Sequence, residues 1–303
     1  MSDAPVDVYS SHLLNTPHGA VEYAVAGDGP TLLFVHGAGG GCDQARDVAR
    51  RHGNRRYRVV AVSRFGYSRT PLPPHATLAD QADAYACVLD ALGVPSATLV
   101  AVSAGAPSAL EFAVRHPERC RALVLVAPAV YPDASLAPSA RNPIERYLLA
   151  RLLGARLLLR AFCRMFPRVI IRSVFATPPE VVSAAEDSER SRVIEMIREL
   201  SMVIHGGGGL ALDSRLTICP DMERLSCIRA PTLAISASDD LYRTLDNTRH
   251  ISRIVAHTRL IAYPSGGHLL IGRESHLTAE IATFLQQHMP AQCAANDQEL
   301  AAA

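Results

Sequence analysis

Short apolar runs alternate with helical patterns along most of this chain, and this order constrains the fold more than any other feature. The predicted strands are rich in Val, Leu and Ile and lack strict polar alternation, which is typical of strands buried on both faces of a parallel sheet. They are Val21–Val25, Thr31–Val35, Arg58–Val62, Ala97–Val102, Ala122–Val126, Thr232–Ile235 and Arg259–Ala262, with an earlier strand near Val8–Leu14 expected to pair antiparallel with the first. Helical patterns follow most strands, at Asp43–Arg51, Leu78–Leu92, Pro107–His116 and Thr278–His288. Such alternation predicts a doubly wound α/β fold.

The alternation stops after Pro128. Residues 131–228 show helical patterns, the longest at Asn142–Phe166 and Pro179–His205, without a convincing strand. A helical insertion after the sixth predicted strand indicates a cap over one edge of the sheet. The Ala- and Gln-rich end of the chain is expected to be disordered. The predicted domains are a core of residues 1–130 and 229–290, a cap of residues 131–228 and a disordered tail of residues 291–303.

The composition excludes several classes of protein. With 303 residues, 49% of them apolar, the chain is long enough for one large domain with an insertion. The 30 basic and 29 acidic residues nearly balance, unlike the basic footprint of a nucleic-acid-binding protein. We find no signal peptide and no apolar run long enough for a membrane span. Seven scattered cysteines fit neither a disulfide framework nor a zinc site, so we expect a cytoplasmic protein with reduced thiols and no metal.

A Ser-x-Gly sequence, Ser103-Ala104-Gly105, joins the strand Ala97–Val102 to the helix after it. A serine between small residues at such a turn is typical of a nucleophile elbow, which holds the hydroxyl at the carboxyl edge of the sheet. The full G-x-S-x-G pattern has Ala101 in place of its first glycine, a difference of one methyl group. Because Ser-x-Gly also occurs in ordinary turns, the assignment of Ser103 as a nucleophile depends on its partners.

Four glycines occur between His36 and Gly41, directly after the strand Thr31–Val35. A loop of this kind lets the backbone approach a ligand closely. The G-x-G-x-x-G spacing of a dinucleotide-binding loop is not met, and no acidic residue ends a neighbouring strand to bind a ribose. The better interpretation is an oxyanion loop, in which the N–H groups of Ala38 and Ala104 hold developing negative charge. An ordinary tight turn is the alternative.

A carboxylate and a histidine follow two later strands. Asp239 and Asp240 come after the strand Thr232–Ile235, where an aspartate is also common as a helix cap. His268 stands in a glycine-rich turn after the last strand, and the ordinary pKa of histidine, about 6.5, suits a general base. A serine, then an aspartate, then a histidine, each after a strand, is the chain order of α/β-hydrolase triads.

Together these features resemble the α/β-hydrolase superfamily over about residues 18–130 and 229–288. The resemblance rests on His36-Gly37-Ala38-Gly39, Ser63 to Pro71, Val102 to Gly105, Ala230 to Leu233 with Asp240, and Gly266-Gly267-His268. It implies an α/β-hydrolase fold, with a mostly parallel central sheet flanked by helices and a helical cap inserted after the sixth strand. The family pattern of a small residue, two further residues and then Asp, counted from Ala237, implies that Asp240 is the acid of the triad.

The superfamily hosts many reactions, and the fold alone does not choose between them. Dehalogenases and epoxide hydrolases of this fold have an aspartate at the elbow, where this chain has Ser103. The Pro-containing loops of proline iminopeptidases and meta-cleavage product hydrolases are absent from Gly37–Gly41. The resemblance therefore implies a capped, esterase-like serine hydrolase that takes a small, largely apolar acyl substrate and needs no cofactor. Carbon–carbon bond hydrolysis, lactone hydrolysis, acyl transfer, perhydrolysis and a ligand receptor of the same fold remain alternatives.

The predicted cap contains a leucine-rich helix with arginines at 146, 151, 156, 160 and 164. At 100° per residue, Arg156, Arg160 and Arg164 share one face. One interpretation is a helix that lies on a membrane surface. The favoured interpretation is a cap helix with a solvated basic face and leucines over the active site. Those leucines are Leu148, Leu149, Leu152, Leu153 and Leu157.

Overall fold

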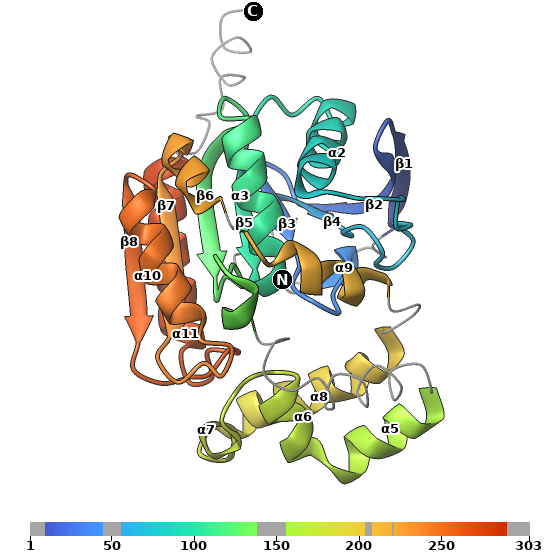
Figure 1. Ribbon diagram of the computed structural model, residues 1–303, viewed down its shortest axis with the longest axis vertical. Helices are drawn as coiled ribbons and strands as arrows, with labels where there is room; N and C mark the ends of the chain where they lie inside the picture. The colour runs from blue at the N-terminus through green and yellow to red at the C-terminus, as the bar shows by residue number, and fades with distance from the viewer. Residues whose placement is uncertain (1–9, 45–55, 138–155, 204–207, 220, 290–303) are drawn as a thin grey trace, which may run out of the picture.

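The computed structural model describes residues 10–44, 56–137, 156–203, 208–219 and 221–289. Strands in these ranges form one sheet of eight, in the order β1-β2-β4-β3-β5-β6-β7-β8 (Figure 1). From β4 to β8 all neighbours run parallel, whereas β1 and β2 add an antiparallel edge. The strands are β1 His12–Thr16, β2 Gly19–Ala26, β3 Thr31–Val35, β4 Arg58–Val62, β5 Ala97–Val102, β6 Cys120–Val126, β7 Thr232–Ala237 and β8 Thr258–Tyr263.

The parallel interior of the sheet confirms the prediction from the apolar runs. β3, β4 and β5 have the predicted bounds, and every residue of β3 is buried. The other strands after β1 extend the predicted ranges by one or two residues at one or both ends. β1 begins at His12 in the described residues, and the part of the predicted strand before residue 10 lies outside them. β1 pairs antiparallel with β2 as predicted. The alternation of sequence hydrophobicity therefore located the strands that lie in the middle of the sheet.

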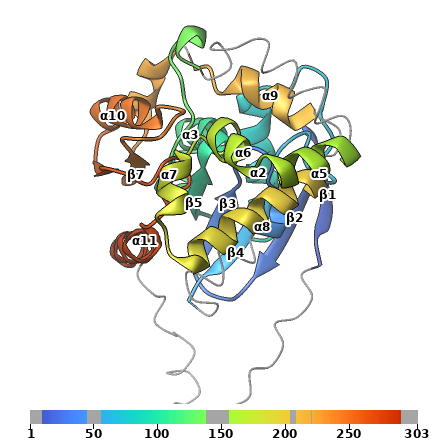
Figure 2. The ribbon, with the colours of Figure 1, turned by 90° about the horizontal axis from the view of Figure 1, so that it is seen from below.

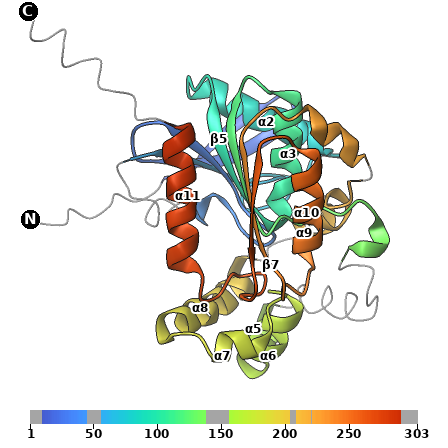
Figure 3. The same ribbon diagram turned by 90° about the vertical axis from the view of Figure 1, so that its left-hand side faces the viewer.

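Helices cover both faces of the sheet (Figure 3). α2 (Leu78–Ala91), α3 (Ala106–Arg115) and α10 (Thr244–Ile254) lie on one face, and α11 (Glu274–His288) lies on the other. Each face has its own apolar cluster: Leu33 and Leu99 pack with Tyr85 and Phe112 on one side, while Leu32 and Phe34 pack with Phe284 on the other. Two buried layers against one sheet are the arrangement that a doubly wound fold requires.

Two helix boundaries show where sequence signals were sufficient and where they were not. α2 starts after Thr77, whose hydroxyl accepts from the Asp80 N–H at 3.1 Å, while the Asp80 carboxylate accepts from the Thr77 N–H at 3.0 Å. α10 was not predicted, because its eleven residues include few large apolar side chains and no side chain caps its start. The predicted helix at Asp43–Arg51 lies mostly outside the described residues, which end here in a short 3-10 turn at Cys42–Gln44.

A separate layer of helices lies beyond the carboxyl ends of the parallel strands (Figures 1 and 2). It follows β6, as the predicted insertion does, and its own apolar cluster includes Cys163, Ile170 and Val193. Ile271, which follows β8, joins this cluster and so ties the layer to the core. The helices are α5 Arg156–Met165, α6 Pro167–Ser173, α7 Pro179–Ser183 and α8 Asp187–Val203.

The last part of the predicted cap packs differently. α9 (Gly208–Leu216) and the 3-10 helix Met222–Cys227 place Leu212, Met222 and Leu225 in the main cluster of the core. The chain therefore packs against the core from α9 onward, before residue 228, where the predicted cap ends. None of the helices in the described ranges combines the length and the apolar character needed to cross a bilayer.

Candidate active site

The turn after β5 has the backbone of a nucleophile elbow. Ser103 has a φ of 50°, a left-handed conformation that is uncommon for a residue with a Cβ, and α3 begins three residues later. A Cβ on Gly105 would lie 2.6 Å from the His36 carbonyl oxygen and 2.7 Å from that of Val35, so only glycine fits there. Ala101, which replaces the first glycine of the motif, is fully buried in the sheet. The turn thus accepts the extra methyl group.

His268 lies between the elbow and a buried carboxylate. Its Nε2 is 2.8 Å from the Ser103 hydroxyl, and its Nδ1 is 2.8 Å from Asp240 Oδ2. An ionised carboxylate only accepts, so Nδ1 carries the proton and Nε2 is free to accept the serine proton. The side chain of His268 is 9% exposed and that of Asp240 is fully buried, which keeps this pair in a region of low dielectric. The three residues come from the ends of β5, β7 and β8.

The two adjacent aspartates have different contacts. Asp240 accepts from the Tyr242 N–H at 2.8 Å and from the Thr244 hydroxyl, in addition to its contact with His268. Asp239 instead accepts from the N–H groups of Gly266, at 3.2 Å, and Gly267, at 2.8 Å. Asp240, the residue selected by the register from Ala237, therefore contacts the imidazole, whereas Asp239 holds the loop that carries it.

The glycine-rich loop after β3 lies against the elbow. A Cβ on Gly37 would be 3.2 Å from the Cβ of Ser103. The Gly37 carbonyl accepts from His36 Nδ1 at 2.6 Å, and His36 Nε2 accepts from the Arg64 N–H at 2.9 Å. Burial, and then the nearby Arg64 cation, hold the pKa of His36 well below its ordinary value. His36 is therefore neutral, and it fixes the peptide group whose N–H belongs to Ala38.

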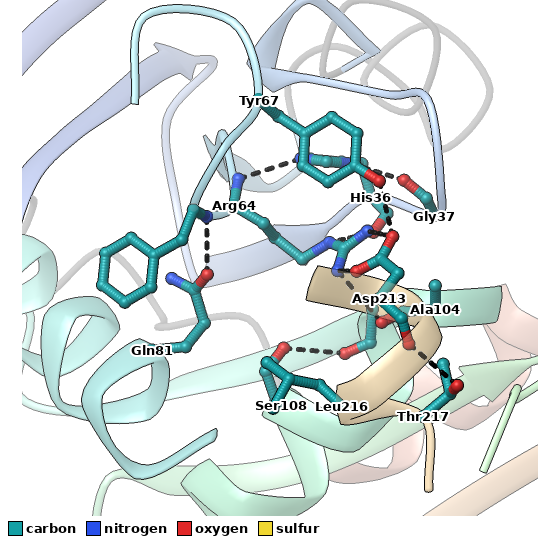
Figure 4. A network of polar contacts seen from close by, with 12 residues as sticks. His36, Gly37, Arg64, Tyr67, Gln81, Ala104, Ser108, Asp213, Leu216 and Thr217 are labelled. Carbon is teal, nitrogen blue, oxygen red and sulfur yellow. Dashed lines mark hydrogen bonds and ion pairs between the residues drawn. The ribbon is translucent and has the colours of Figure 1, made fainter. Parts of the chain in front are cut away.

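A buried ion pair joins the two segments that carry Ala38 and Ala104 (Figure 4). The guanidinium of Arg64 donates to the His36 carbonyl at 2.9 Å and to the Ala104 carbonyl at 3.1 Å. It also donates twice to the carboxylate of Asp213, and both side chains are under 10% exposed. Tyr67 donates to the same carboxylate at 2.5 Å. Arg64 thus contacts one carbonyl from each of the two predicted oxyanion segments.

No local sequence pattern predicted a role for Arg64 or Asp213. Arg64 lies in the Ser63–Pro71 segment that supported the family resemblance, so its position after β4 gave a signal that could have been followed. Asp213 stands on α9, 149 residues along the chain from Arg64, and no local pattern connects the two. A contact of this kind becomes visible only when the fold brings the residues together.

The helical layer also contacts the loops that carry Asp240 and His268. The carbonyl of Val174 accepts from the Tyr242 hydroxyl at 2.8 Å, and Thr177 Oγ1 accepts from the Leu269 N–H at 3.2 Å. The Tyr242 ring meets the His268 ring edge-on, with 4.9 Å between centroids. The segment between α6 and α7 therefore holds both loops in place.

The described residues contain no cluster of three or more His, Cys, Asp or Glu side chains with the spacing of a metal site. The groups that the structure joins at Ser103 are a hydroxyl, an imidazole and a carboxylate. These suit nucleophilic attack on a carbonyl, followed by proton return.

The comparisons with known proteins agree with the fold. A family model described as the alpha/beta hydrolase fold matches residues 30–274. The chain is 26% identical over 277 residues to the uncharacterized hydrolase YcgS of Bacillus subtilis, covering 87% of this chain and 93% of that one. An alpha/beta hydrolase fold protein from Nakamurella multipartita superposes with a TM-score of 0.67 at 26% identity, over 91% of this chain and 99% of the other.

A further relative has a stated activity. The 2-hydroxy-6-oxo-6-phenylhexa-2,4-dienoate hydrolase of Comamonas testosteroni is 24% identical, over 82% of this chain and 84% of its own length. The family match covers most of this chain, so the chain belongs to the α/β-hydrolase family and is a hydrolase of that fold.

Proposed function

We propose that this protein is a serine hydrolase that cleaves a small, largely apolar ester or related acyl substrate through an acyl-enzyme intermediate. The observation that carries the proposal is the continuous chain of contacts from Asp240 through His268 to Ser103, with 2.8 Å at both steps. Ser103 and His268 stand 165 positions apart in the chain, and the fold brings them within hydrogen-bond distance at one edge of the sheet. Such an alignment serves nucleophilic catalysis.

The proposed reaction has two halves. His268 Nε2 takes the proton of Ser103 as the hydroxyl oxygen attacks the substrate carbonyl, and Asp240 stabilises the imidazolium that forms. The N–H groups of Ala38 and Ala104 hold the oxyanion, at about 3 kcal/mol for each donor in comparable sites. His268 then gives the proton to the leaving group. In the second half, His268 deprotonates a water molecule that attacks the acyl carbonyl. The bond between the acyl group and the Ser103 oxygen then breaks, and His268 returns the proton to that oxygen.

The helices α5 to α8 support a cap role, because they lie beyond the carboxyl ends of the strands where ligands of open α/β sheets bind. We propose that they set the substrate range. Four of the leucines expected over the site, Leu148, Leu149, Leu152 and Leu153, lie outside the described residues, as does the side chain of Leu157. We further propose a cytoplasmic setting, which is supported by the free thiols of Cys42, Cys87, Cys120, Cys163, Cys219 and Cys227.

A second candidate is carbon–carbon bond hydrolysis on the same residues. The similarity to the Comamonas testosteroni hydrolase favours it, although the glycine-rich loop here lacks the proline that is common in such enzymes. Purified protein assayed with p-nitrophenyl esters, lactones and vinylogous diketones separates the two candidates. Turnover of the diketone at a rate well above that of every ester would replace the esterase proposal with this one.

The nucleophile is tested with a fluorophosphonate probe on the native protein and on Ser103→Ala. We expect covalent labelling of the native protein at Ser103 and none of the variant, with a loss of esterase turnover of about a millionfold, as in other triads. Ser108→Ala is the matched control, because Ser108 is a buried serine in the first turn of α3 whose hydroxyl donates to the Gly105 carbonyl. Equal labelling of Ser103→Ala and native protein would refute the assignment.

A further inference from the structure

The cap carries a regular series of arginines that the proposed reaction does not use. Within residues 156–173, which form α5 and α6, every fourth residue is an arginine, and no acidic residue occurs. Helix periodicity already places the first three arginines on one face, and the series continues past the break at Phe166 into α6. The five residues of the series are Arg156, Arg160, Arg164, Arg168 and Arg172.

α5 and α6 each have one packed face and one open face. Cys163, Ile170 and Ile171 point inward and join the apolar cluster of the cap with residues of α7 and α8. Arg160 and Arg164 of α5 are exposed, and so are Arg168 and Arg172 of α6. Among the contacts of these four guanidinium groups, one is an ion pair at 3.4 Å between Arg168 and Glu180, in which both side chains are about 70% exposed.

Exposed apolar side chains lie between these arginines along the chain. Met165 is 68% exposed, Phe166 46% and Val169 45%, and these three neighbours account for three of the seven large apolar residues that are exposed in the described ranges. They stand at the joint between α5 and α6. Figures 1 and 3 show this joint on the outer side of the cap, away from the sheet. Exposed apolar residues gathered in one place mark a contact surface more often than singly scattered ones do.

We infer that this outer face of the cap, the surface formed by Arg160, Arg164, Met165, Phe166, Arg168, Val169 and Arg172, binds an anionic lipid surface. An interfacial helix places apolar side chains in the boundary between headgroups and acyl chains and keeps cationic side chains at the level of the phosphates. The cap surface has both parts: an apolar joint and arginines on either side of it. Arginine also pairs bidentately with phosphate, which suits phospholipid headgroups.

Charge argues against a second copy of the chain as the occupant. Two copies that met through this same surface would bring eight exposed arginines together around a small apolar centre. Like charges across an interface oppose association. A lipid surface of opposite charge satisfies the cations and the apolar joint at once.

The geometry also orients the bound protein. Because the cap covers the carboxyl edge of the sheet, contact through its outer face turns that edge, and the loops of Ser103 and His268, toward the lipid. The inference concerns binding alone and does not depend on the reaction that Ser103 performs.

Co-sedimentation with vesicles tests the inference. The native protein is mixed with vesicles of phosphatidylcholine alone and with vesicles containing about a third phosphatidylglycerol, at low and at high salt. We expect binding to the anionic vesicles at low salt and a decrease as salt rises, because screening weakens the arginine contacts. Each arginine removed lowers vesicle affinity about fivefold, so the double variant Arg164→Gln/Arg168→Gln loses about 25-fold. Met165→Ser/Phe166→Ser abolishes most of the binding that remains at high salt.

Matched controls separate this surface from general effects. Arg229→Gln/Arg249→Gln removes two exposed arginines of the core, whose side chains are 80% and 50% exposed. Leu13→Ser/Leu72→Ser removes two exposed apolar residues, which are 51% and 42% exposed. Both controls should bind vesicles like the native protein. Circular dichroism tests whether each variant is folded. We expect no loss of folded structure, because all the changed side chains are exposed or half-exposed.

Three results would overturn the inference. The first is equal sedimentation of the native protein with neutral and anionic vesicles, or with neither. The second is native-like binding by the Arg164→Gln/Arg168→Gln variant. The third is a native dimer, seen by analytical ultracentrifugation, that Met165→Ser/Phe166→Ser converts to a monomer while vesicle binding is absent, because the surface would then be a contact between copies of the chain.

Discussion

Replacing Arg64 by methionine removes the ion pair that links the two oxyanion segments. The substitution keeps an unbranched side chain of similar length and deletes the guanidinium. Asp213 then keeps the Tyr67 hydroxyl as a hydrogen-bond partner but no cation, in a position where its side chain is 8% exposed. The carbonyls of His36 and Ala104 each lose a donor.

The magnitude follows from these contacts. Breaking a buried ion pair by removing one partner costs about 3–5 kcal/mol, because the other charge stays buried. Each orphaned carbonyl adds about 1 kcal/mol. Methionine recovers part of the packing. We therefore expect Arg64→Met to lower the free energy of unfolding by about 5 kcal/mol, a large fraction of the stability of an ordinary domain.

A double-mutant cycle in urea keeps the argument testable when the single variant is marginally folded. Asp213→Leu in the Arg64→Met background removes the stranded carboxylate, so the double variant should be more stable than Arg64→Met alone by about 2 kcal/mol. Arg115→Met is the control, because Arg115 pairs with Asp83 at the surface. We expect this substitution to lower the free energy of unfolding by at most about 1 kcal/mol.

Turnover reports whether the ion pair positions the oxyanion segments or only stabilises the fold. In the folded double variant we expect kcat to fall about 10²- to 10³-fold, as when one oxyanion donor is lost, with KM little changed. Unchanged kcat in a folded double variant would refute the positioning role of Arg64. Simple additivity of the two single substitutions would refute the ion-pair argument.

Three further predictions concern single groups. Asp240→Asn should lower turnover about 10⁴-fold, through the wrong imidazole tautomer, and Asp239→Asn far less; the reverse ranking contradicts the geometry. The lowered pKa of His36 means that the unfolded chain takes up a proton first as pH falls, so stability should decline below about pH 6.5 by up to ~1.4 kcal/mol per unit. Denaturation of His36→Gln should show a smaller decline over that range. Burial raises the pKa of Cys120 to about 12, so a thiol reagent at pH 8 should modify the exposed Cys227 first, as peptide mapping can show; early modification of Cys120 contradicts this.

The candidate site was predictable where a local pattern determines the backbone. Ser103 lies between residues that must be small, since a Cβ on Gly105 would overlap two carbonyl oxygens. His268 and Asp240 follow buried strands, and the ends of parallel strands meet at one edge. The hydrophobic period of the strands and the chain order therefore predicted that a serine, an aspartate and a histidine meet at this edge, and the family resemblance selected Asp240 over Asp239.

Other features depend on contacts between distant segments. α10 gave no clear pattern, because a few apolar residues such as Ile251 and Ile254 are enough to hold it against the core. The placement of α9 with the core, and not with the cap, follows from Leu212 and from the pairing of Asp213 with Arg64. No local signal predicts such packing, since it depends on which surface is within reach after folding.

The sequence by itself determined the class of fold, the order of the central strands and the identity of the residues around Ser103. It did so because the side-chain period of a buried strand and the steric limits of a tight turn are local properties. Only the tertiary structure decided which cation joins the oxyanion segments, which part of the insertion packs with the core and which face of α5 and α6 is open. Those outcomes depend on distances between residues far apart in the chain, and such distances are set by the packing of the whole molecule.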